Sequence, residues 1–270
     1  MTVETLSLPI IEGALTTTVV GRPAFGANEL HAQIDSTNTR AAQLARDGAA
    51  EGTLILARQQ TAGRGRQGRA WSSPPDAGIA LSVLLRPQIP LSRLPLITLA
   101  TGVACASAIE ETCGIKLGLK WVNDLTYGGK KVGGILAEMP GQALVIGLGI
   151  NIRLDLASLP EDLKAKVEWL ENITGTPVSP NLIVIALARK LEDEYNALKN
   201  GQDQEIIERW KSYSITIGKE IIAQTALKEI RGRAVDLTAS GALIVESADG
   251  TRTELTAGEI TIRMADGSYC

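Results

Sequence analysis

The chain has 270 residues, a formal net charge of −3 and 44% hydrophobic residues. This length can hold one large domain, or a large domain with a small one, and the apolar share is sufficient for a proper core. The slightly acidic balance argues against nucleic acid as the main partner, so we expect no DNA binding. Three cysteines and a single histidine argue against a disulfide framework, a histidine-rich metal site and a Ser-His-Asp triad.

The amino-terminal segment, residues 1–30, shows no strong periodicity and no basic, apolar leader. We expect a short preamble to a cytoplasmic protein whose cysteines stay reduced. The apolar run over 94–108 is short for a membrane span and contains Thr98, Thr101 and Ser107. It predicts a buried helix, so we expect no membrane association.

Helix and strand signals are mixed over the middle of the chain. Ser36 offers a capping hydroxyl ahead of a helix predicted over 39–47, although such a side chain can also face a ligand. The further elements predicted up to residue 152 are strands over 53–57 and 79–85, a helix over 92–112 with Ser92 as N-cap and Gly114 as stop, and strands over 116–122, 125–127, 130–138, 143–147 and 149–152. Gly128-Gly129 between two of these strands is a hairpin-turn signal.

The secondary-structure pattern changes after residue 216, from helices to short strands. Ahead of it we predict a loop with a short helix over 155–170, a linker over 172–180, and helices over 180–198 and 203–213. Five short strands over 220–263 then predict a small β-barrel. The chain is therefore expected to be α+β, with a large domain over 31–215 and a barrel over 216–270.

One loop is rich in arginine and glycine and follows the strand predicted over 53–57. Its residues include Gln60, Gly63, Arg64, Gly65, Arg66, Gly68, Arg69 and Trp71. Glycine lets the main chain approach a ligand closely, and the arginine fork fits phosphate or carboxylate oxygens. The pattern predicts a loop that closes on an anion.

We expect much of this loop to be disordered until a ligand is bound. Ordering the twelve residues 61–72 would cost on the order of 12–24 kcal/mol of conformational entropy. Each charge-assisted hydrogen bond returns only about 1.5–3 kcal/mol. The loop should therefore fold over its ligand, and proteolysis at its arginines should fall when the ligand is present.

Three other interpretations compete for the loop. The spacing Gly63-x-Gly65-x-x-Gly68 matches a dinucleotide-binding pattern, but Pro74-Pro75 rather than a helix follows, and Gln88 stands where an acid is needed. An RNA-binding tract would repeat and lie in a basic chain. A solvated basic loop remains open on these residues alone.

More charged and flat side chains follow between residues 120 and 134. Lys131 precedes Gly133-Gly134 on a strand that should be half-buried, where a charge needs a partner. Asp124 could hold Mg²⁺ or simply begin a turn. Trp71 and Trp121 offer flat faces for an adenine. Together with Lys120, these residues predict a triphosphate site without a nucleophilic side chain, suited to nucleotidyl transfer by positioning and charge neutralisation.

The motifs, taken in order, closely resemble those of biotin protein ligases, from Ser36 into the carboxy-terminal barrel. They are Ser36-Thr37-Asn38, the Gln60 to Trp71 loop, Lys120-Trp121-x-Asn123-Asp124, Lys131-Val132-x-Gly134-Ile135-Leu136-x-Glu138 and Gly147-x-Gly149-Ile150-Asn151. The resemblance implies a mixed-sheet catalytic domain with an SH3-like barrel. It also implies a ligase that lacks the amino-terminal helix-turn-helix domain of family members that repress transcription.

The resemblance further implies a two-step reaction. The biotin carboxylate attacks the α-phosphate of Mg·ATP, which gives biotinyl-5′-adenylate and pyrophosphate. A lysine of a biotin carboxyl carrier domain, from acetyl-CoA carboxylase or a related carboxylase, then takes the biotinyl group and releases AMP. Because the mixed anhydride hydrolyses readily, the arginine loop is expected to shield it.

Site residues carried over from the resemblance fall into three groups. Those implied to bind biotin are Ser36, Thr37, Asn38, Gln60, Gly63, Arg64, Gly65, Arg66, Lys131, Gly133, Gly134 and Gly147. Those implied to bind the nucleotide are Arg66, Arg69, Trp71, Lys120, Asn123, Asp124 and Asn151. The implied catalytic groups are Lys131, Arg66, Lys120 and Asp124, with Asp124 as the candidate magnesium ligand.

The sequence departs from the family in one motif and leaves alternatives open. Val122 stands where proline is frequent, which should loosen that turn. A lipoyl- or octanoyl-transferring relative of the same fold and a non-catalytic biotin-binding regulator are the alternative functions. We expect a monomer or a weak homodimer.

Overall fold

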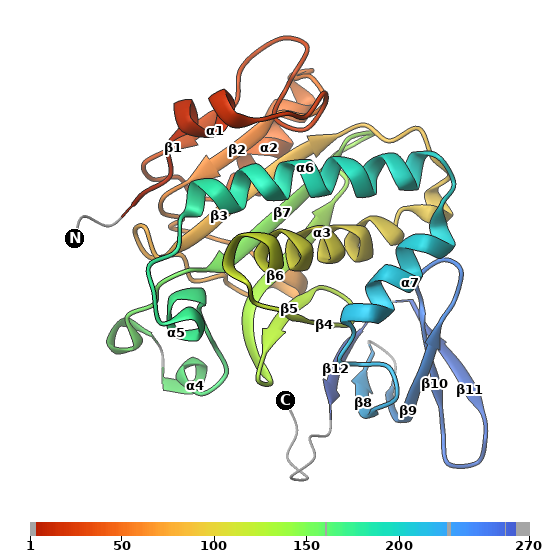
Figure 1. The fold of residues 1–270 in the computed structure, drawn as a ribbon. Coiled ribbons are helices and arrows are strands. Elements are labelled where there is room, and N and C mark those ends of the chain that lie inside the picture. The colour runs from red at the N-terminus through yellow and green to blue at the C-terminus, as the bar shows by residue number, and fades with distance from the viewer. Residues whose placement is uncertain (1–3, 160, 226–227, 257, 263–270) are drawn as a thin grey trace.

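Seven strands form the larger of two β-sheets, in the order β1-β2-β3-β7-β6-β5-β4 (Figure 1). They are β1 (Glu29–His31), β2 (Leu54–Ala57), β3 (Gly78–Leu85), β4 (Gly118–Lys120), β5 (Asp124–Tyr127), β6 (Lys130–Glu138) and β7 (Leu144–Asn151). The computed structural model describes residues 4–159, 161–225, 228–256 and 258–262. Because β1 runs parallel to β2 and the other neighbours run antiparallel, the sheet is mixed, as expected.

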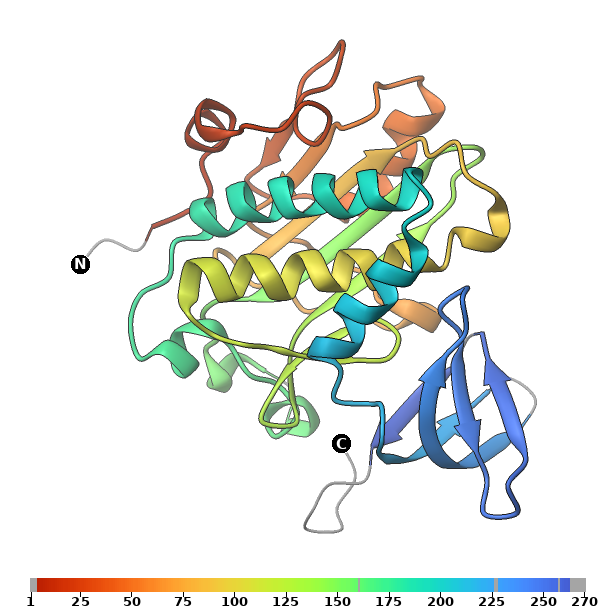
Figure 2. The same cartoon turned by 45° about the vertical axis from the view of Figure 1, so that its right-hand side comes forward.

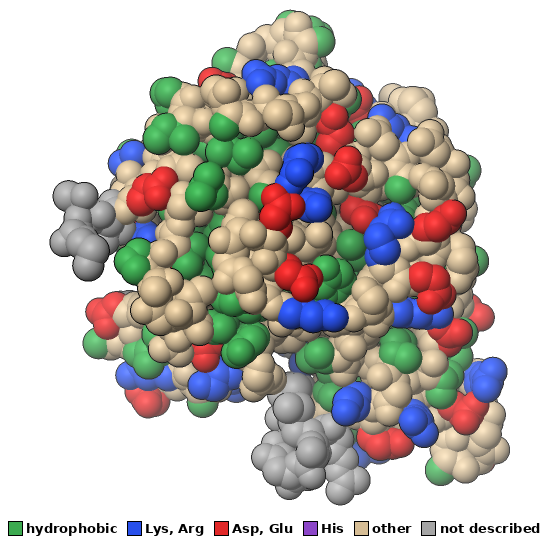
Figure 3. Space-filling model, in the orientation of Figure 1, with side chains coloured by type: hydrophobic (Ala, Val, Ile, Leu, Met, Phe, Trp, Pro, Cys, Tyr) green, Lys and Arg blue, Asp and Glu red, His purple; other side chains and the backbone are tan. Residues whose placement is uncertain are grey.

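The two longest helices cover one face of this sheet. In chain order the helices are α1 (Leu8–Ala14), α2 (Thr37–Arg46), α3 (Leu96–Cys113), α4 (Glu161–Lys164), α5 (Leu170–Thr174), α6 (Pro180–Lys199) and α7 (Asp203–Tyr213). α3 and α6 lie side by side across the sheet, with α7 crossing the end of α3 (Figures 1 and 2). On this side of the molecule acidic and basic side chains are interspersed, so no strong field of one sign develops (Figure 3).

Strand alternation separates an apolar face from a polar one. Ile146, Leu148 and Ile150 of β7 belong to the main core under α3 and α6. The residues between them, Gly147 and Gly149, therefore point to the opposite face, where α2 packs. That opposite face is where the candidate site lies.

The helix α3 is buried as predicted, and its start differs from the prediction. In the described residues, 91–113 is the one segment long and apolar enough to cross a membrane, and it is instead packed within the core of this fold. Gly114 ends the helix in the left-handed conformation, with φ 68°. The expected N-cap at Ser92 is wrong, because a short 3₁₀ turn (Leu91–Arg93) comes first and Pro95 occupies the cap position.

Two predicted strand boundaries also differ. The segments predicted as two strands around Gly147 and Gly149 form the single strand β7, because β3 and β6 hydrogen-bond to it on both sides. The strand predicted over 116–122 is shortened to β4. The chain turns at Trp121, whose peptide bond to Val122 is cis. α5 lies partly in the segment predicted as a linker.

The carboxy-terminal sheet has the five strands that the sequence predicts. They are β8 (Glu220–Gln224), β9 (Glu229–Leu237), β10 (Leu243–Glu246), β11 (Arg252–Leu255) and β12 (Glu259–Ile262). The strands are antiparallel in the order β11-β10-β9-β8-β12 and curl into a small unit beside the large sheet (Figure 2). The Trp121 indole reaches this unit and donates to the carbonyl of Gly241 at 3.1 Å.

The amino-terminal preamble is more ordered than its sequence suggests. It contains helix α1, whose Ile11 is fully buried, and α1 packs against α6. Further along, the Glu192 carboxylate of α6 accepts hydrogen bonds from the Val19 and Val20 amides at 2.7 and 2.8 Å. It also accepts from the amide and hydroxyl of Thr18 at 2.8 and 2.9 Å. These four bonds tie the segment to the helix layer.

We predict that Glu192→Gln destabilises the fold at neutral pH. Burial raises the pKa of Glu192, but the hydrogen bonds from Thr18, Val20 and Val19 outweigh it, so the pKa is lowered. The carboxylate therefore stabilises the fold above its ordinary pKa, and this contribution is lost as the pH falls through the lowered value. The variant should lose roughly 1.5–3 kcal/mol near neutral pH. Thermal unfolding measured near pH 7 and near pH 4 should show this deficit shrinking in acid.

Asp193→Asn is the matched control, since Asp193 is the exposed neighbour on the same helix. Its unfolding temperature should stay close to wild type at both pH values. An equal deficit for Glu192→Gln in acid and at neutral pH would contradict the proposed origin of the effect.

Candidate active site

Two glycines of β7 leave room on the polar face of the sheet. A Cβ at Gly147 would lie 2.1 Å from Asn38 Oδ1, and a Cβ at Gly149 would lie 2.4 Å from the Trp71 ring. Real side chains do not tolerate such distances, so both positions require glycine. The consequence is that Asn38 and Trp71, from two distant segments, lie directly on the sheet.

The start of α2 supplies the first wall of the site. Ser36 is the N-cap of this helix, which confirms its capping role, and Ser36, Thr37 and Asn38 are all buried. The Gln60 side chain accepts from the Thr37 amide at 2.8 Å and from the Thr37 hydroxyl at 3.2 Å. Helix α2 and the entrance of the arginine loop are thus joined by a side chain predicted to belong to the site.

Two residues that the sequence did not assign to the site organise this wall. Ser82 of β3 donates to Asn38 Oδ1 at 2.6 Å and lies 2.8 Å from the Thr37 hydroxyl. The Glu138 carboxylate accepts from Asn38 Nδ2 at 2.8 Å. A polar residue inside the apolar run 79–85 was the available signal for Ser82. Glu138 stands within the family motif, but its contacts with Asn38 and Arg64 are seen only in the folded structure.

The arginine loop takes a compact conformation in the structure. Gly65 N donates to Arg69 O at 2.7 Å, and Trp71 N donates to Gly63 O at 2.8 Å, which makes a small hairpin. Its tip is a 3₁₀ turn (Arg66–Gly68) in which Gln67 has φ 56°. The predicted change from disorder to order on ligand binding stays a prediction.

Two arginines of the loop reach different parts of the molecule. Arg64 pairs with Glu138 at 2.7 Å, on the side of α2. Arg66 donates to Asn123 Oδ1 at 3.1 Å and to the Gly258 carbonyl of the carboxy-terminal sheet at 3.4 Å. Arg69 is exposed. The loop therefore spans the site from the α2 wall to the second domain.

A bulge in the β5–β6 pairing turns Lys131 toward the site. The register shifts so that Leu125 pairs with Gly133 but Thr126 pairs with Lys131. Because of this extra residue, Lys131 lies on the same face as Gly134, with Lys131 Nζ 3.2 Å from the position of a Gly134 Cβ. In a regular strand, residues three apart would face opposite sides.

Lys131 already has a counter-ion in this structure. Its ammonium group lies 2.6 Å from Asp124 Oδ1 and 5.6 Å from the centre of the Trp71 ring. Both side chains of the ion pair are about a third exposed or less. The prediction that this lysine needs a partner is confirmed, and the partner is the carboxylate predicted to hold magnesium.

The other edge of the site is formed by the segment 166–169. Lys131 N donates to Lys166 O and Glu168 N donates to Lys131 O, both at 2.8 Å. Asn151, at the end of β7, donates from its side chain to Glu168 O at 3.1 Å. Asn151 is therefore linked to Lys131 through the main chain of Glu168, and its assignment to the nucleotide stays a prediction.

Two predicted site residues lie elsewhere. Trp121 is 3% exposed and packed against the carboxy-terminal sheet, so it offers no face for an adenine. Gly133 faces the core, where a Cβ would lie 2.9 Å from Leu125, so of the glycine pair it is Gly134 that faces Trp71. Lys120 is on the edge strand β4, opposite Asp124 in register. Asn38, Trp71 and Lys131 lie over the polar face, at Gly147, Gly149 and Gly134.

Asp124 is the carboxylate of the site that was predicted to hold a metal ion. Among the described residues there is no group of three or more His, Cys, Asp or Glu side chains placed to hold one. Mg²⁺ usually takes one or two carboxylates and completes its shell with substrate phosphates and water. Asp124 alone fits a magnesium ion that arrives with a nucleotide, and it does not fit a resident metal.

The site combines a glycine floor, a capped helix start and two cations, Lys131 and Arg64, whose counter-ions are carboxylates of the site itself. Such a site suits an anionic ligand held by positioning and charge. Residues 30–155 match the biotin/lipoate A/B protein ligase family, and residues 216–263 match the biotin protein ligase C-terminal domain.

Curated relatives cover nearly the whole chain. The bifunctional ligase/repressor BirA of Bacillus subtilis is 34% identical over 252 residues, which are 92% of this chain and 76% of the relative. The biotin--[acetyl-CoA-carboxylase] ligase of Paracoccus denitrificans is 32% identical over 238 residues, covering 85% of this chain and 98% of the relative.

Solved structures agree with the sequence relatives. The biotin protein ligase of Aquifex aeolicus, in complex with biotin and ATP, has a TM-score of 0.79 at 28% identity and covers 88% of this chain and 99% of its own. That of Leishmania major, in complex with biotinyl-5-AMP, has a TM-score of 0.59 at 26% identity, with 85% and 98% covered. Fold and site thus define a protein ligase of the biotin/lipoate class. The chain belongs to the biotin protein ligases within it, which confirms the resemblance of the motifs.

We predict that Gly147→Ala displaces Asn38 and weakens the fold. The new methyl group would occupy the position of Asn38 Oδ1 and break the hydrogen bond to Ser82. Overpacking of this kind costs about 1–3 kcal/mol, which thermal unfolding will measure. Gly13→Ala is the control, because its Cβ meets nothing within 4 Å on an exposed turn of α1. Equal unfolding temperatures for both variants would show that Asn38 does not depend on the glycine.

Proposed function

We propose that this chain uses ATP to attach biotin to a specific lysine of a biotin carboxyl carrier domain, through biotinyl-5′-AMP. The observation that carries the proposal is the meeting of Lys131 and the arginine loop over the glycine floor of β6 and β7. Biotin is a carboxylate and ATP a triphosphate, so both need cations at one place. The relatives bound to biotin, ATP and biotinyl-5-AMP support this choice of ligands.

The internal ion pairs of the site suit an exchange with these ligands. Lys131–Asp124 and Arg64–Glu138 are partly exposed pairs, and such pairs contribute only about 0–1 kcal/mol each. A ligand anion can replace the carboxylate at small cost, while the cation is never left unpaired. Release of Asp124 from Lys131 would make its carboxylate available to the Mg²⁺ that accompanies ATP.

The first chemical step needs no nucleophile from the protein. A biotin carboxylate oxygen forms a bond to the α-phosphorus of ATP, and the bond to the bridging oxygen breaks to release pyrophosphate. Lys131 and Arg66 would hold the reacting carboxylate and phosphate, and Lys120 would help to neutralise the charge of the leaving group. Mg²⁺, held by Asp124 and the phosphates, would supply further neutralisation.

The second step transfers the biotinyl group. The neutral amine of the acceptor lysine attacks the acyl carbon, AMP leaves, and the amine loses a proton as the amide forms. Between the two steps the mixed anhydride must be kept from water, and we infer that the arginine loop covers it. The proposed role of the loop is therefore to protect the adenylate from hydrolysis.

We assign the ligand halves by position in the fold. Ser36, Thr37, Asn38, Gln60 and Arg64 surround the α2 side and are proposed to hold biotin with Lys131 over Gly134 and Gly147. Arg66 and Asn123, which are hydrogen-bonded to each other, and Asn151, which is bonded to Glu168, are proposed to hold the nucleotide with Trp71, Arg69 and Lys120. The cytoplasmic location and the monomeric or weakly dimeric state stay predictions.

The proposal is tested by mass spectrometry of a carrier domain incubated with the enzyme, biotin and Mg·ATP. We expect one added biotinyl group on one lysine, and no modification without ATP. Addition of lipoate or octanoate instead would favour a lipoyl- or octanoyl-transferring function. Biotin binding without any transfer would favour a non-catalytic regulator.

We predict that Lys131→Met slows the release of pyrophosphate by about 100-fold or more, as loss of one preorganised charged donor does at other sites. Lys130→Met is the matched control, because Lys130 is the exposed neighbour at the hairpin turn. Pyrophosphate release measured in a coupled assay should be near normal in the control. A Lys131→Met enzyme with an unchanged rate would remove this lysine from the mechanism.

We predict that Arg66→Gly lets the adenylate escape and label lysines indiscriminately, because one clamp on the phosphate is gone. The measurement is biotin on bystander proteins after incubation without a carrier domain. Gln67→Gly is the control, since this exposed residue already has a left-handed φ of 56° and glycine keeps that conformation. Adenylate that remains bound in Arg66→Gly would refute the clamp role.

A further inference from the structure

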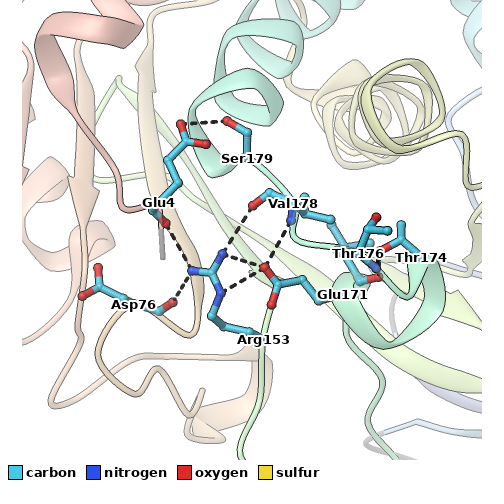
Figure 4. Close-up of polar contacts among 9 residues, drawn as sticks. Glu4, Asp76, Arg153, Glu171, Thr174, Thr176, Val178 and Ser179 are labelled. Atoms are coloured by element: carbon cyan, nitrogen blue, oxygen red, sulfur yellow. Dashed lines mark hydrogen bonds and ion pairs between the residues drawn. The ribbon is translucent and has the colours of Figure 1, made fainter. Parts of the chain in front are cut away.

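Arg153 lies just beyond the strand that carries the site, two residues after Asn151, and its guanidinium group bonds four segments (Figure 4). It donates to Glu171 Oε1 of α5 at 2.7 and 3.1 Å. It also donates to the carbonyls of Asp76 at 3.1 Å, Glu4 at 3.3 Å and Val178 at 3.3 Å. The side chain is only 20% exposed, so these contacts hold it in one place.

Asp76 lies five residues after Trp71, between the arginine loop and β3, where the chain returns to the sheet. It has φ 52°, an uncommon conformation for a residue other than glycine. Its amide donates to Arg58 O at 2.9 Å, across the base of the loop. The next carbonyl, that of Ala77, accepts from the amides of Ile152 and Arg153 at 3.0 and 2.9 Å. Arg153 therefore holds the exit of the loop with both its main chain and its side chain.

Arg58 marks the entrance of the same loop. It donates to the carbonyl of Leu6 at 3.0 Å and lies 3.9 Å from the Asp76 carboxylate. The two ends of the loop are thus joined to each other and to one short stretch of the preamble, Glu4 to Leu6. Arg153 contacts one end of this stretch and Arg58 the other.

This stretch is itself attached to the helix layer. The Glu4 carboxylate accepts from Asn181 Nδ2 at 2.7 Å and from the Ser179 hydroxyl at 2.9 Å. The Asn181 side chain also binds the main chain on both sides of Leu6. It donates to Thr5 O at 3.0 Å and accepts from Ser7 N at 2.8 Å. Asn181 is buried, and these hydrogen bonds all go to residues 4–7. A substitution at Asn181 therefore acts on the loop only through these residues.

We propose that Arg153 is a positioning residue for the arginine loop, and that residues 4–7 are by this contact part of the active-site scaffold. The inference rests on the proposed function for what the loop covers, but the anchoring itself does not. A loop with fixed ends has fewer conformations to lose when it folds over a ligand. Loss of the anchor should therefore loosen the loop before any ligand contact is altered.

The first measurement needs no catalysis. Trypsin cleavage after Arg64, Arg66 and Arg69, followed with and without biotin, reports how often the loop leaves the compact hairpin that the structure shows. We expect cleavage in Arg153→Met to be about tenfold faster than in wild type, which corresponds to about 1.4 kcal/mol less resistance to opening. Arg153→Lys should restore part of the protection, because an ammonium group can reach only some of the four segments.

The second measurement follows the adenylate. In Arg153→Met the release of free biotinyl-5′-AMP, in the absence of a carrier domain, should rise about tenfold, while the affinity for biotin stays within about twofold. Asn181→Leu should change both readouts in the same direction and by less. The double variant should exceed Arg153→Met only slightly, because both changes act through residues 4–7.

Arg93→Met is the matched control. Arg93 is 23% exposed, pairs with Asp203 and donates to the carbonyl of Leu198, all in the α6–α7 region away from the loop. It should lower the unfolding temperature without changing loop cleavage. If Arg153→Met behaves like Arg93→Met, the positioning role is overturned. If the wild type makes no adenylate, the proposed function fails, and trypsin cleavage alone still decides the role of Arg153.

Discussion

The site depends on a constraint of strand geometry: each residue must face one side of the sheet or the other. In β7 the residues on one side are large and aliphatic and pack under α3 and α6. On the other side Gly147 and Gly149 have no side chains, so Asn38 and Trp71 lie directly on the main chain. The same strand thus carries part of the core and the floor of the site. A substitution at either glycine acts on the site through the positions of other side chains.

Three cations of the site have local partners within this frame. Lys131 is held by Asp124 and Arg64 by Glu138, while Arg66 is bound to an amide oxygen and a carbonyl. None of these interactions is deeply buried, so each can be exchanged for a ligand oxygen at small cost. An enzyme that binds anionic substrates and releases anionic products needs cations that can pair with ligand oxygens or with protein oxygens. Neither binding nor release then leaves a cation unpaired.

Parts of the chain far from the site in sequence support it from two directions. The preamble, through Arg58 and Arg153, fixes the base of the arginine loop. The carboxy-terminal sheet touches the tip of that loop at Gly258 and holds Trp121 next to the Asn123-Asp124 turn. The loop is therefore contacted at its base and at its tip by segments that lie outside the ligand pocket.

Local chemistry determined much of this protein from the sequence: the turn glycines, the helix stop at Gly114, the five terminal strands and the cationic, glycine-rich loop. These follow from dihedral preferences and charge, which act over a few residues. Three features were decided only by the tertiary structure. The bulge turns Lys131 to the face of Gly134 and leaves Gly133 toward the core, Trp121 packs against the second domain, and Ser82 and Glu138 join the site. Each depends on strand register or on contacts between distant segments, and a single sequence does not encode these in any local pattern.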